Sequence, residues 1–317
     1  MHIAITNKNH NWRVGILTTY FDYYIINTTP HFERIIIMEW TKLRQDEFND
    51  AVVKSNKVCV LPIGCVEAHG IHLPLGCDVF HGRYISSKAA EIAEVCVFPE
   101  MYFGEKSGAG EYPGTIIFPT PLIWQILEQC CSEISRNGFK KILLVSSHGG
   151  NTAMLQAFSR YMLQKKPDYI VSVYSLALPR VDKILEQIDE YSYLTDDDVA
   201  IIQKYVDEGH WDGHGGFTES AWIKTIYPEL MRIDLMDKKC GESTHRLDEV
   251  SKHKIYSPFA WMANYPDSYS ASYLSGLNER IARALTEYGI NETAKVFSFY
   301  KNETALNEYY DEWIKKQ

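Results

Sequence analysis

Short apolar runs alternate with longer amphipathic segments along most of this chain from residue 57 onward. The runs are too short for buried helices and are bounded by turn residues, so they predict strands: VCVLPIG (58–64), VCVFPEM (95–101), KKILLV (140–145) and YIVSVYSLAL (169–178). The segments between them carry apolar residues at helical spacing, over 85–95, 122–138 and 152–163. This alternation predicts an α/β fold with a mostly parallel central sheet.

The two ends of the chain lie outside this alternation. Residues 1–37 keep neither helical nor strand periodicity for long, whereas MEWTKLRQDEFNDAVV (38–53) predicts a capped amphipathic helix. We therefore interpret residues 1–37 as an N-terminal extension and hypothesise that the natural chain begins at Met38. Residues 38–317 contain no repeat, low-complexity tract or linker, so they are predicted to form a single domain whose C-terminal part is helical.

Residues 180–212 are also predicted to be helical, and they are acidic. Thr195 is placed to cap a helix that begins at Asp196, because a threonine oxygen can accept a hydrogen bond from the free N–H groups of a first turn. The run Asp196, Asp197 and Asp198 is interpreted as a solvated helix start, where carboxylates are favoured by the helix dipole.

Composition narrows the classes of function. The net charge of -9 argues against a nucleic-acid partner, since such proteins usually carry clustered Lys and Arg. Seven cysteines without a C-x-x-C motif do not form a disulfide framework in a chain of 317 residues, which favours a reducing, cytoplasmic location. No apolar run approaches the roughly 20 residues that span a bilayer, so no membrane association is expected.

Acids and histidines gather directly after two of the predicted strands and in one later segment. Glu67, His69 and Asp78 follow VCVLPIG, and His148 follows KKILLV in SSHGGN. The later segment, WDGHGGFTES (211–220), holds another histidine and glutamate. Because ligands collect outside the carboxyl ends of strands in an open parallel sheet, we expect these groups to form one site.

The residue types indicate a metal site. Carboxylates and neutral imidazoles form an oxygen and nitrogen ligand set that suits Zn²⁺, Mn²⁺ and related divalent ions, and a carboxylate can bridge two of them. No thiolate is required, so Cys65 and Cys77 are interpreted as packing residues. Each cluster alone could be structural, and the Gly-rich loop after His148 could equally bind a phosphate at a helix start.

Four blocks of the sequence resemble the creatininase family, also called creatinine amidohydrolases. They are LPIGCVEAHGIHLPLGCD (61–78), SGAGEYPGT (107–115), SSHGGN (146–151) and WDGHGGFTESAWIKTIYPELM (211–231), and they occur in the order found in that family. The resemblance covers most of the chain from about Met38 to Ala284. It implies a three-layer α/β/α domain that binds two divalent metal ions, zinc or manganese, with Fe²⁺ as a further candidate.

The resemblance also implies roles for individual residues. It assigns Glu67, His69, Asp78 and His148 to the metals, with Asp78 bridging. Creatininase has a further glutamate where this chain has Gly150, and we interpret Glu219 as its replacement, both as ligand and as catalytic group. By the same resemblance His214 shuttles a proton to the leaving nitrogen, His72 supports the ligands, and four residues contact the substrate: Ser107, Glu111, Tyr112 and Trp211.

The function implied is that of a metal-dependent amidohydrolase, in which a metal-activated water attacks a cyclic amide or related C–N carbonyl carbon of a small molecule. Gly149, Gly150 and Gly213 depart from creatininase, so creatinine itself is not the expected substrate. Opening of a cyclic keto-polyol of the inosose type and a non-catalytic metal-binding homologue are the alternatives. Relatives are hexamers, which implies a homo-oligomer here.

Overall fold

The structure is a computed structural model. It describes residues 4–7, 12–15, 38–106, 108–176, 181–209, 212–235, 241–270 and 276–316. The chain divides into two compact units, Met1–Ile35 and Ile36–Gln317. In the first unit, strands β1 (Ala4–Asn7) and β2 (Trp12–Gly15) pair antiparallel. Whether residues 1–37 belong to the natural protein stays a prediction.

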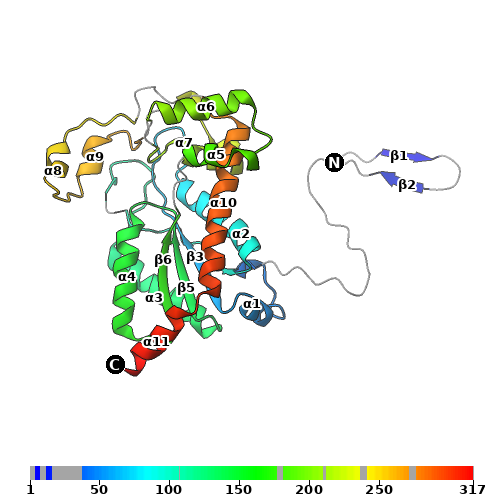
Figure 1. Cartoon of the computed structure of the whole chain (residues 1–317), viewed down its shortest axis with the longest axis vertical. Coiled ribbons are helices and arrows are strands. Elements are labelled where there is room, and N and C mark those ends of the chain that lie inside the picture. Colours follow the sequence, from blue (N-terminus) through cyan, green and yellow to red (C-terminus); the bar gives the residue numbers. More distant parts are fainter. Residues whose placement is uncertain are drawn as a thin grey trace. The chain divides into compact units, whose positions relative to one another are not determined.

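A four-stranded parallel sheet forms the centre of the larger unit (Figure 1). Its strands lie in the order β4 (Cys96–Val97), β3 (Val58–Ile63), β5 (Lys141–Ser146) and β6 (Ile170–Ser175). All three neighbouring pairs are parallel, which confirms the predicted α/β fold. Strand β4 is shorter than the predicted 95–101, although pairing with β3 resumes beyond it in an isolated parallel bridge between Met101 and Ile63.

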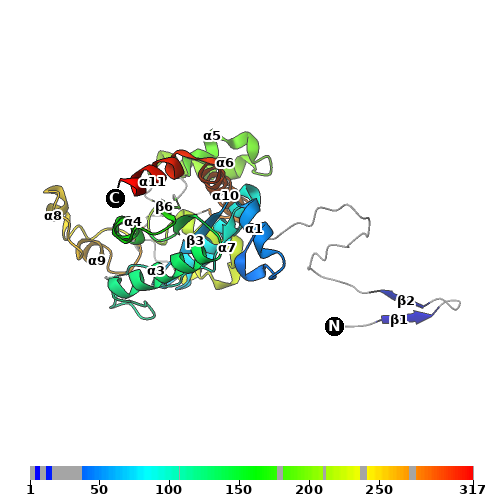
Figure 2. The same ribbon diagram turned by 90° about the horizontal axis from the view of Figure 1, so that it is seen from below.

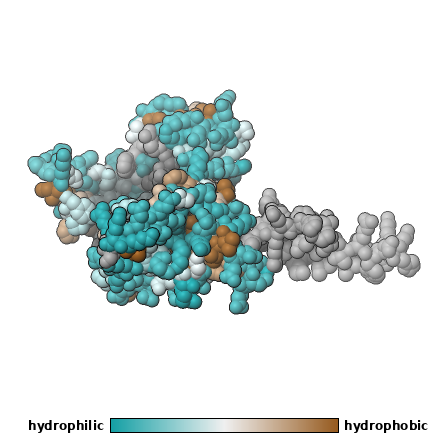
Figure 3. Space-filling model, turned by 60° about the horizontal axis from the view of Figure 1, so that its bottom comes forward, coloured by the Kyte–Doolittle hydropathy of each residue, from teal (hydrophilic) through white to brown (hydrophobic). Residues whose placement is uncertain are grey.

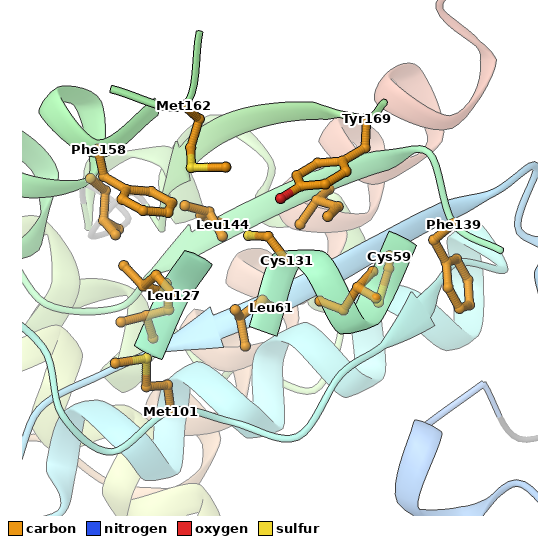
Figure 4. Packing of buried hydrophobic residues seen from close by; sticks show 14 of the residues in the cluster. Cys59, Leu61, Met101, Leu127, Cys131, Phe139, Leu144, Phe158, Met162 and Tyr169 are labelled. Carbon is orange, nitrogen blue, oxygen red and sulfur yellow. The ribbon is translucent and has the colours of Figure 1, made fainter. Parts of the chain in front are cut away.

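Helices cover both faces of the sheet, as the three-layer prediction requires. On one face, Cys59, Leu61 and Leu144 pack against helices α3 (Thr120–Arg136) and α4 (Asn151–Lys165), and Figure 4 shows this core from close by. On the other face, alternate residues of the same strands pack against α2 (Cys77–Ala93) and α10 (Glu279–Asn302): Val58, Val60, Leu143 and Val145. Figures 1 and 2 show α4 and α10 on opposite sides of the sheet. The period-two alternation of strand side chains therefore feeds two separate cores.

The segment predicted as one helix over 38–53 forms two elements instead. A 3-10 turn, η1 (Trp40–Lys42), precedes helix α1 (Phe48–Lys54). In a continuous helix, residues eight apart would be separated by about 12 Å along the axis. The ring centroids of Trp40 and Phe48 lie 4.6 Å apart, and Trp40 also contacts Phe98 and Phe139. Aromatic packing onto the core thus folds this segment back on itself.

The remaining helices lie mainly beyond the carboxyl ends of the strands and in the C-terminal region. They are α5 (Asp182–Glu186), α6 (Asp196–Asp207), α7 (Phe217–Ile226), α8 (Asp248–Lys252), α9 (Ala260–Asn264) and α11 (Ala305–Lys315). Short 3-10 turns join some of them: η2 (Ile188–Glu190), η3 (Pro228–Leu230) and η4 (Ile233–Leu235). Helices α5, α6, α7 and α10 share a third core, which includes Ile202, Phe217 and Ile281.

Helix α6 begins as predicted, but one of its acidic residues is not solvated. Thr195 caps the helix and accepts a hydrogen bond from the Asp198 backbone N–H. Asp196 and Asp197 are exposed, whereas Asp198 is buried and binds Arg280 at the start of α10. The interpretation of the whole run as a solvated helix start is therefore wrong at Asp198, because a distant arginine compensates its charge.

The surface of the larger unit is mostly hydrophilic on the side shown in Figure 3, with hydrophobic side chains in small separate patches. Among the described residues, no helix is both long enough and apolar enough to cross a membrane.

Candidate metal centre

The candidate site lies at the carboxyl ends of β3 and β5. From β3 the chain continues to β4 on one side, while β5 pairs with the other side of β3. The strand order reverses at this point, and such switch points are where open parallel sheets bind ligands. The residues that follow the two strands, 64–72 and 147–151, therefore meet at one edge of the sheet.

A close approach of backbone to backbone brings Asp78 into this site. Helix α2 begins at Cys77, so Asp78 lies in its first turn, well before the helix predicted at 85–95. A Cβ added at Gly64 would lie 2.7 Å from the Val79 backbone nitrogen. Glycine at this position lets the end of β3 pack directly against the first turn of α2.

Asp78 stands between two imidazoles. Its Oδ1 lies 3.2 Å from His69 Nε2, and its Oδ2 lies 3.0 Å from His148 Nδ1. All three side chains are at most 9% exposed. A carboxylate that presents one oxygen to each of two histidines has the geometry needed to bridge two metal ions.

Two glutamates complete the cluster, one beside each imidazole. Glu67 Oε1 lies 2.8 Å from His148 Nδ1. Glu219, on α7, lies 3.6 Å from His69 Nε2 and accepts a hydrogen bond of 2.7 Å from the Gly215 N–H. The structure thus brings together the five side chains that the sequence suggested as ligands: Glu67, His69, Asp78, His148 and Glu219.

The charges of this cluster depend on one another. Burial favours the neutral form of Glu67, but the adjacent His148 outweighs it and holds the pKa of that carboxyl below its usual range. Burial likewise opposes protonation of His69 and His148, yet the adjacent carboxylates raise their pKa values to about 9 and about 10. Burial raises the pKa of Glu219 to about 7.

These directions fit a cation site. Buried carboxylates need compensating positive charge, and in this arrangement protons on the imidazoles supply it. A divalent cation could replace those protons, because oxygen and imidazole donors are the ligands that zinc and manganese take in proteins.

Lys106 is a site residue that the sequence analysis missed. Its ammonium forms an ion pair with Glu67 and lies 5.0 Å from the centre of the Trp261 ring. Asn151, at the start of α4, holds the adjoining loop by accepting a hydrogen bond of 2.6 Å from the Glu105 N–H. A single lysine in a loop carries no periodicity or motif that could have revealed this position.

A pocket of about 520 Å³ opens over the cluster. His148, His214 and Glu219 line it, and its outer wall comes from a later segment that includes Tyr256, Trp261 and Met262. Lys106, Gly149 and Gly150 also face it. The aromatic wall was not predicted, because residues 256–262 are remote in sequence from the blocks that carry the resemblance.

His214 is fixed against the ligands. Its Nε2 lies 2.8 Å from the Ala68 carbonyl oxygen, which can only accept, so Nε2 carries the hydrogen. Nδ1 then holds the lone pair of the neutral ring and faces Glu67 Oε1 at 3.9 Å. Burial lowers the pKa of His214 to about 3, and the nearby His69 acts in the same direction.

His72 touches the cluster only indirectly. Its Nε2–H donates to the Gly215 carbonyl oxygen at 2.9 Å, and burial lowers its pKa to about 4. Because the Gly215 N–H in turn binds Glu219, His72 holds the backbone that orients that carboxylate.

None of the four predicted substrate contacts is found among the described residues that line the pocket. Ser107 and Trp211 lie outside the described residues. Glu111 is exposed and Tyr112 donates to the Tyr265 carbonyl oxygen, and neither is among the described residues that line the pocket. The structure therefore does not bring these two side chains to the metal cluster.

Cys65 is more than the packing residue predicted. Its thiol lies 3.0 Å from Asp78 Oδ2 and 3.4 Å from Glu67 Oε1, so it hydrogen-bonds to the carboxylates. Burial and these two negative charges raise the pKa of the Cys65 thiol, which keeps it protonated and able to donate. Cys77 is fully buried in a small apolar cluster with Leu73 and Ile223.

Comparison with known proteins places this site in a family. Creatinine amidohydrolase from Pseudomonas putida is 25% identical over 207 residues, which cover 61% of this chain and 73% of that protein. A crystal structure of creatinine amidohydrolase (creatininase) aligns with a TM-score of 0.62 at 20% identity, over 84% of this chain and 99% of that one. A manganese creatininase aligns with a TM-score of 0.63 over the same shares, also at 20% identity. The sequence model of the creatininase family, described as creatinine amidohydrolase, matches residues 41–297, and this chain therefore belongs to the creatininase family.

Proposed function

We propose that this protein is a divalent-metal-dependent amidohydrolase that cleaves a carbon–nitrogen bond at the carbonyl carbon of a small, cyclic amide. The observation that carries the proposal is the position of Asp78, whose two oxygens face His69 and His148 below an open pocket. Related structures support it: one creatininase contains manganese, another is of a Zn-Zn type, and a variant is complexed with creatine.

The ligands divide into two sets that share Asp78. Glu67, Asp78 and His148 would hold one ion, and His69, Asp78 and Glu219 would hold the other. Zinc and manganese are the expected metals, with Fe²⁺ as a further candidate. When bound, such ions polarise a carbonyl group and lower the pKa of water into the neutral range.

His214 is the proton-transfer group of this proposal. Its neutral ring keeps Nε2–H on the Ala68 carbonyl, so Nδ1 is the atom that can take a proton from the attacking water. The same Nδ1 can then deliver that proton to the leaving nitrogen. Trp261 meets the His214 ring edge to face at 5.1 Å between centroids and limits the directions from which solvent reaches it.

The pocket favours a substrate larger than creatinine. A Cβ added at Gly149 would meet no atom within 4 Å, so the pocket is open on this side. By the resemblance described above, creatininase has a bulkier residue at this position. The pocket wall also combines Trp261 with the ammonium of Lys106, a surface suited to a flat ring that carries a hydrogen-bond acceptor.

Metal analysis of the purified protein tests the proposal first. We expect close to two divalent ions per chain after reconstitution with zinc or manganese. A content well below one ion per chain, with no gain on reconstitution, would contradict it. The loaded protein is then offered lactams, cyclic ureides, creatinine, formamides and inosose-type ketones. Ring opening of the cyclic amides is expected, and turnover of only the ketones would replace the proposed reaction by carbon–carbon cleavage.

The homo-oligomeric state, with a hexamer as the form expected from the resemblance, and the cytoplasmic location remain proposals. Light scattering coupled to size-exclusion chromatography measures the first directly.

A further inference from the structure

His81 is a buried histidine that no motif assigns to the site. It lies on α2 one turn after Asp78 and is 1% exposed. Neither of its ring nitrogens has a hydrogen-bond partner within the part of the chain that the structure describes. Buried polar groups are rarely left in this condition, because losing water without a replacement partner is costly. The ring therefore needs an explanation.

The surroundings of His81 direct it towards the metal cluster. Residues three apart on a helix lie on the same face, so His81 and Asp78 point to the same side of α2. The other side of the ring packs on Trp222 of α7, at 4.4 Å between centroids. Helix α7 also carries Glu219, three residues before Trp222. The nearest ligand atoms of Asp78, His81 and Glu219 all lie within 4.8 Å of one another.

The distances match those between ligands of one ion better than those of hydrogen bonds. Donors at about 2.0–2.1 Å from a tetrahedral zinc are separated from each other by about 3.3 Å. His81 Nε2 lies 3.5 Å from Asp78 Oδ1, His69 Nε2 lies 3.2 Å from the same oxygen, and His69 Nε2 lies 3.6 Å from Glu219 Oε2. Two of these three separations exceed the usual range of a nitrogen–oxygen hydrogen bond.

We infer that His81 is a further metal ligand, which joins His69, Asp78 and Glu219 in a site of two nitrogens and two oxygens. The inference rests on the proposed function only in requiring that this cluster binds metal. Zinc accepts four such ligands in tetrahedral geometry. A zinc ion would then give a ring nitrogen of His81 the partner that it lacks.

Zinc affinity of the His81→Leu variant tests this inference without reference to catalysis. Leucine keeps the apolar contact with Trp222 but removes the nitrogen. In a titration against a chromophoric chelator, we expect the wild-type protein to bind two zinc ions and the variant to bind one of them about 100-fold more weakly. His81→Cys, which retains a donor, should recover most of this loss. Trp222→Phe changes the packing of the ring without removing a ligand and should leave both affinities within about threefold of wild type.

The thermal melt of the same variants separates a ligand from a packing residue. Metal-free His81→Leu should be at least as stable as metal-free wild type, because an unpaired polar group has been removed, whereas zinc should raise its Tm less. If the folded variant binds both zinc ions with wild-type affinity, His81 is not a ligand. Crystals of the zinc-loaded wild type need no variant: anomalous density about 2.1 Å from His81 Nε2 is expected, and a zinc beyond about 3 Å would overturn the inference.

Failure of this inference is distinguishable from failure of the proposed function. A wild-type protein that binds no divalent metal overturns both. If the wild type binds two ions but hydrolyses no amide in the panel, the proposed function fails, while the chelator titration still decides the role of His81.

Discussion

The imidazole rings of His69 and His214 stack on each other, with 4.0 Å between their centroids and 25° between their planes. The two rings nevertheless face different partners. His69 presents Nε2 to Asp78 and Glu219, while His214 donates its Nε2–H to the Ala68 carbonyl and turns Nδ1 towards Glu67. One ring of the stack is therefore placed to bind metal and the other to move protons.

Replacing His214 by alanine should separate these two roles. We expect the His214→Ala variant to keep its full metal content and to lose at least about 100-fold in kcat, since positioned general bases typically contribute 10²–10⁴-fold. His69→Ala, the matched variant in the same stack, should instead lose metal. Inductively coupled plasma analysis and kinetics on one substrate measure both. Unchanged turnover by His214→Ala would show that its imidazole has no part in the reaction.

Removal of the metal should destabilise the fold and be accompanied by proton uptake. The cluster of Glu67, Asp78 and Glu219 is buried, so without a cation its charge must be balanced by protons on neighbouring groups. We expect a chelator to lower the Tm by several degrees and zinc to restore it. Calorimetric titrations in buffers of different ionisation enthalpy should then show proton release as zinc binds. Equal Tm values with and without metal would argue that the cluster does not hold an ion.

Two adjacent glycines should respond differently to the same substitution. A Cβ at Gly150 would lie 2.5 Å from His148 Nε2 and 3.2 Å from the Glu105 carbonyl oxygen, whereas one at Gly149 would meet no atom within 4 Å. We therefore expect Gly150→Ala to displace His148 and weaken metal binding by tenfold or more. Gly149→Ala should bind metal normally and serves as the control, although larger side chains there should raise KM. Equal metal affinities in the two alanine variants would contradict this reading of the loop.

The sequence predicted the parts of the site that depend on local order. A buried parallel strand ends at a known edge of the sheet, so Glu67, His69 and His148 could be placed together from their position after β3 and β5. Asp78 followed from the same block. The residue pattern grouped Glu219 with these side chains, but its role as a ligand came only from the resemblance, because its approach depends on how α7 packs against α2.

Other features depend on contacts between distant segments, so the local sequence pattern could not predict them. The predicted helix at 38–53 was wrong because Trp40 packs onto Phe48, Phe98 and Phe139 rather than continuing a helix. Lys106 and Trp261 meet across about half the length of the chain. The sheet itself was predictable because each strand shows its short apolar pattern locally in the sequence. The pocket wall has no such local pattern.

Asp198 offers a prediction about stability that is independent of the metal site. Its buried carboxylate accepts hydrogen bonds from the Thr195 N–H at 2.9 Å, from Asn278 at 2.6 Å and from Arg280 at 2.5 Å, and so joins the starts of α6 and α10. The hydrogen-bonded Arg280 is the main cause that holds the pKa of Asp198 well below its usual range, and the other hydrogen bonds act in the same direction, although burial opposes them. A carboxyl group with a depressed pKa stabilises the fold above its unfolded pKa of about 4, and this contribution is lost as the pH falls further.

We therefore expect Asp198→Asn to lower the free energy of unfolding at pH 7 by about 1–2 kcal/mol, a range that allows for solvent screening of the half-exposed Arg280. The difference between the variant and wild type should shrink as the pH falls below about 4, because the wild-type carboxylate then becomes protonated. Urea unfolding at several pH values measures it. Asp196→Asn, in the same exposed first turn, is the control and should change stability by less than about 0.5 kcal/mol. A pH-independent difference between Asp198→Asn and wild type would mean that the charge of Asp198 contributes nothing and that only its shape is needed at the junction of the two helices.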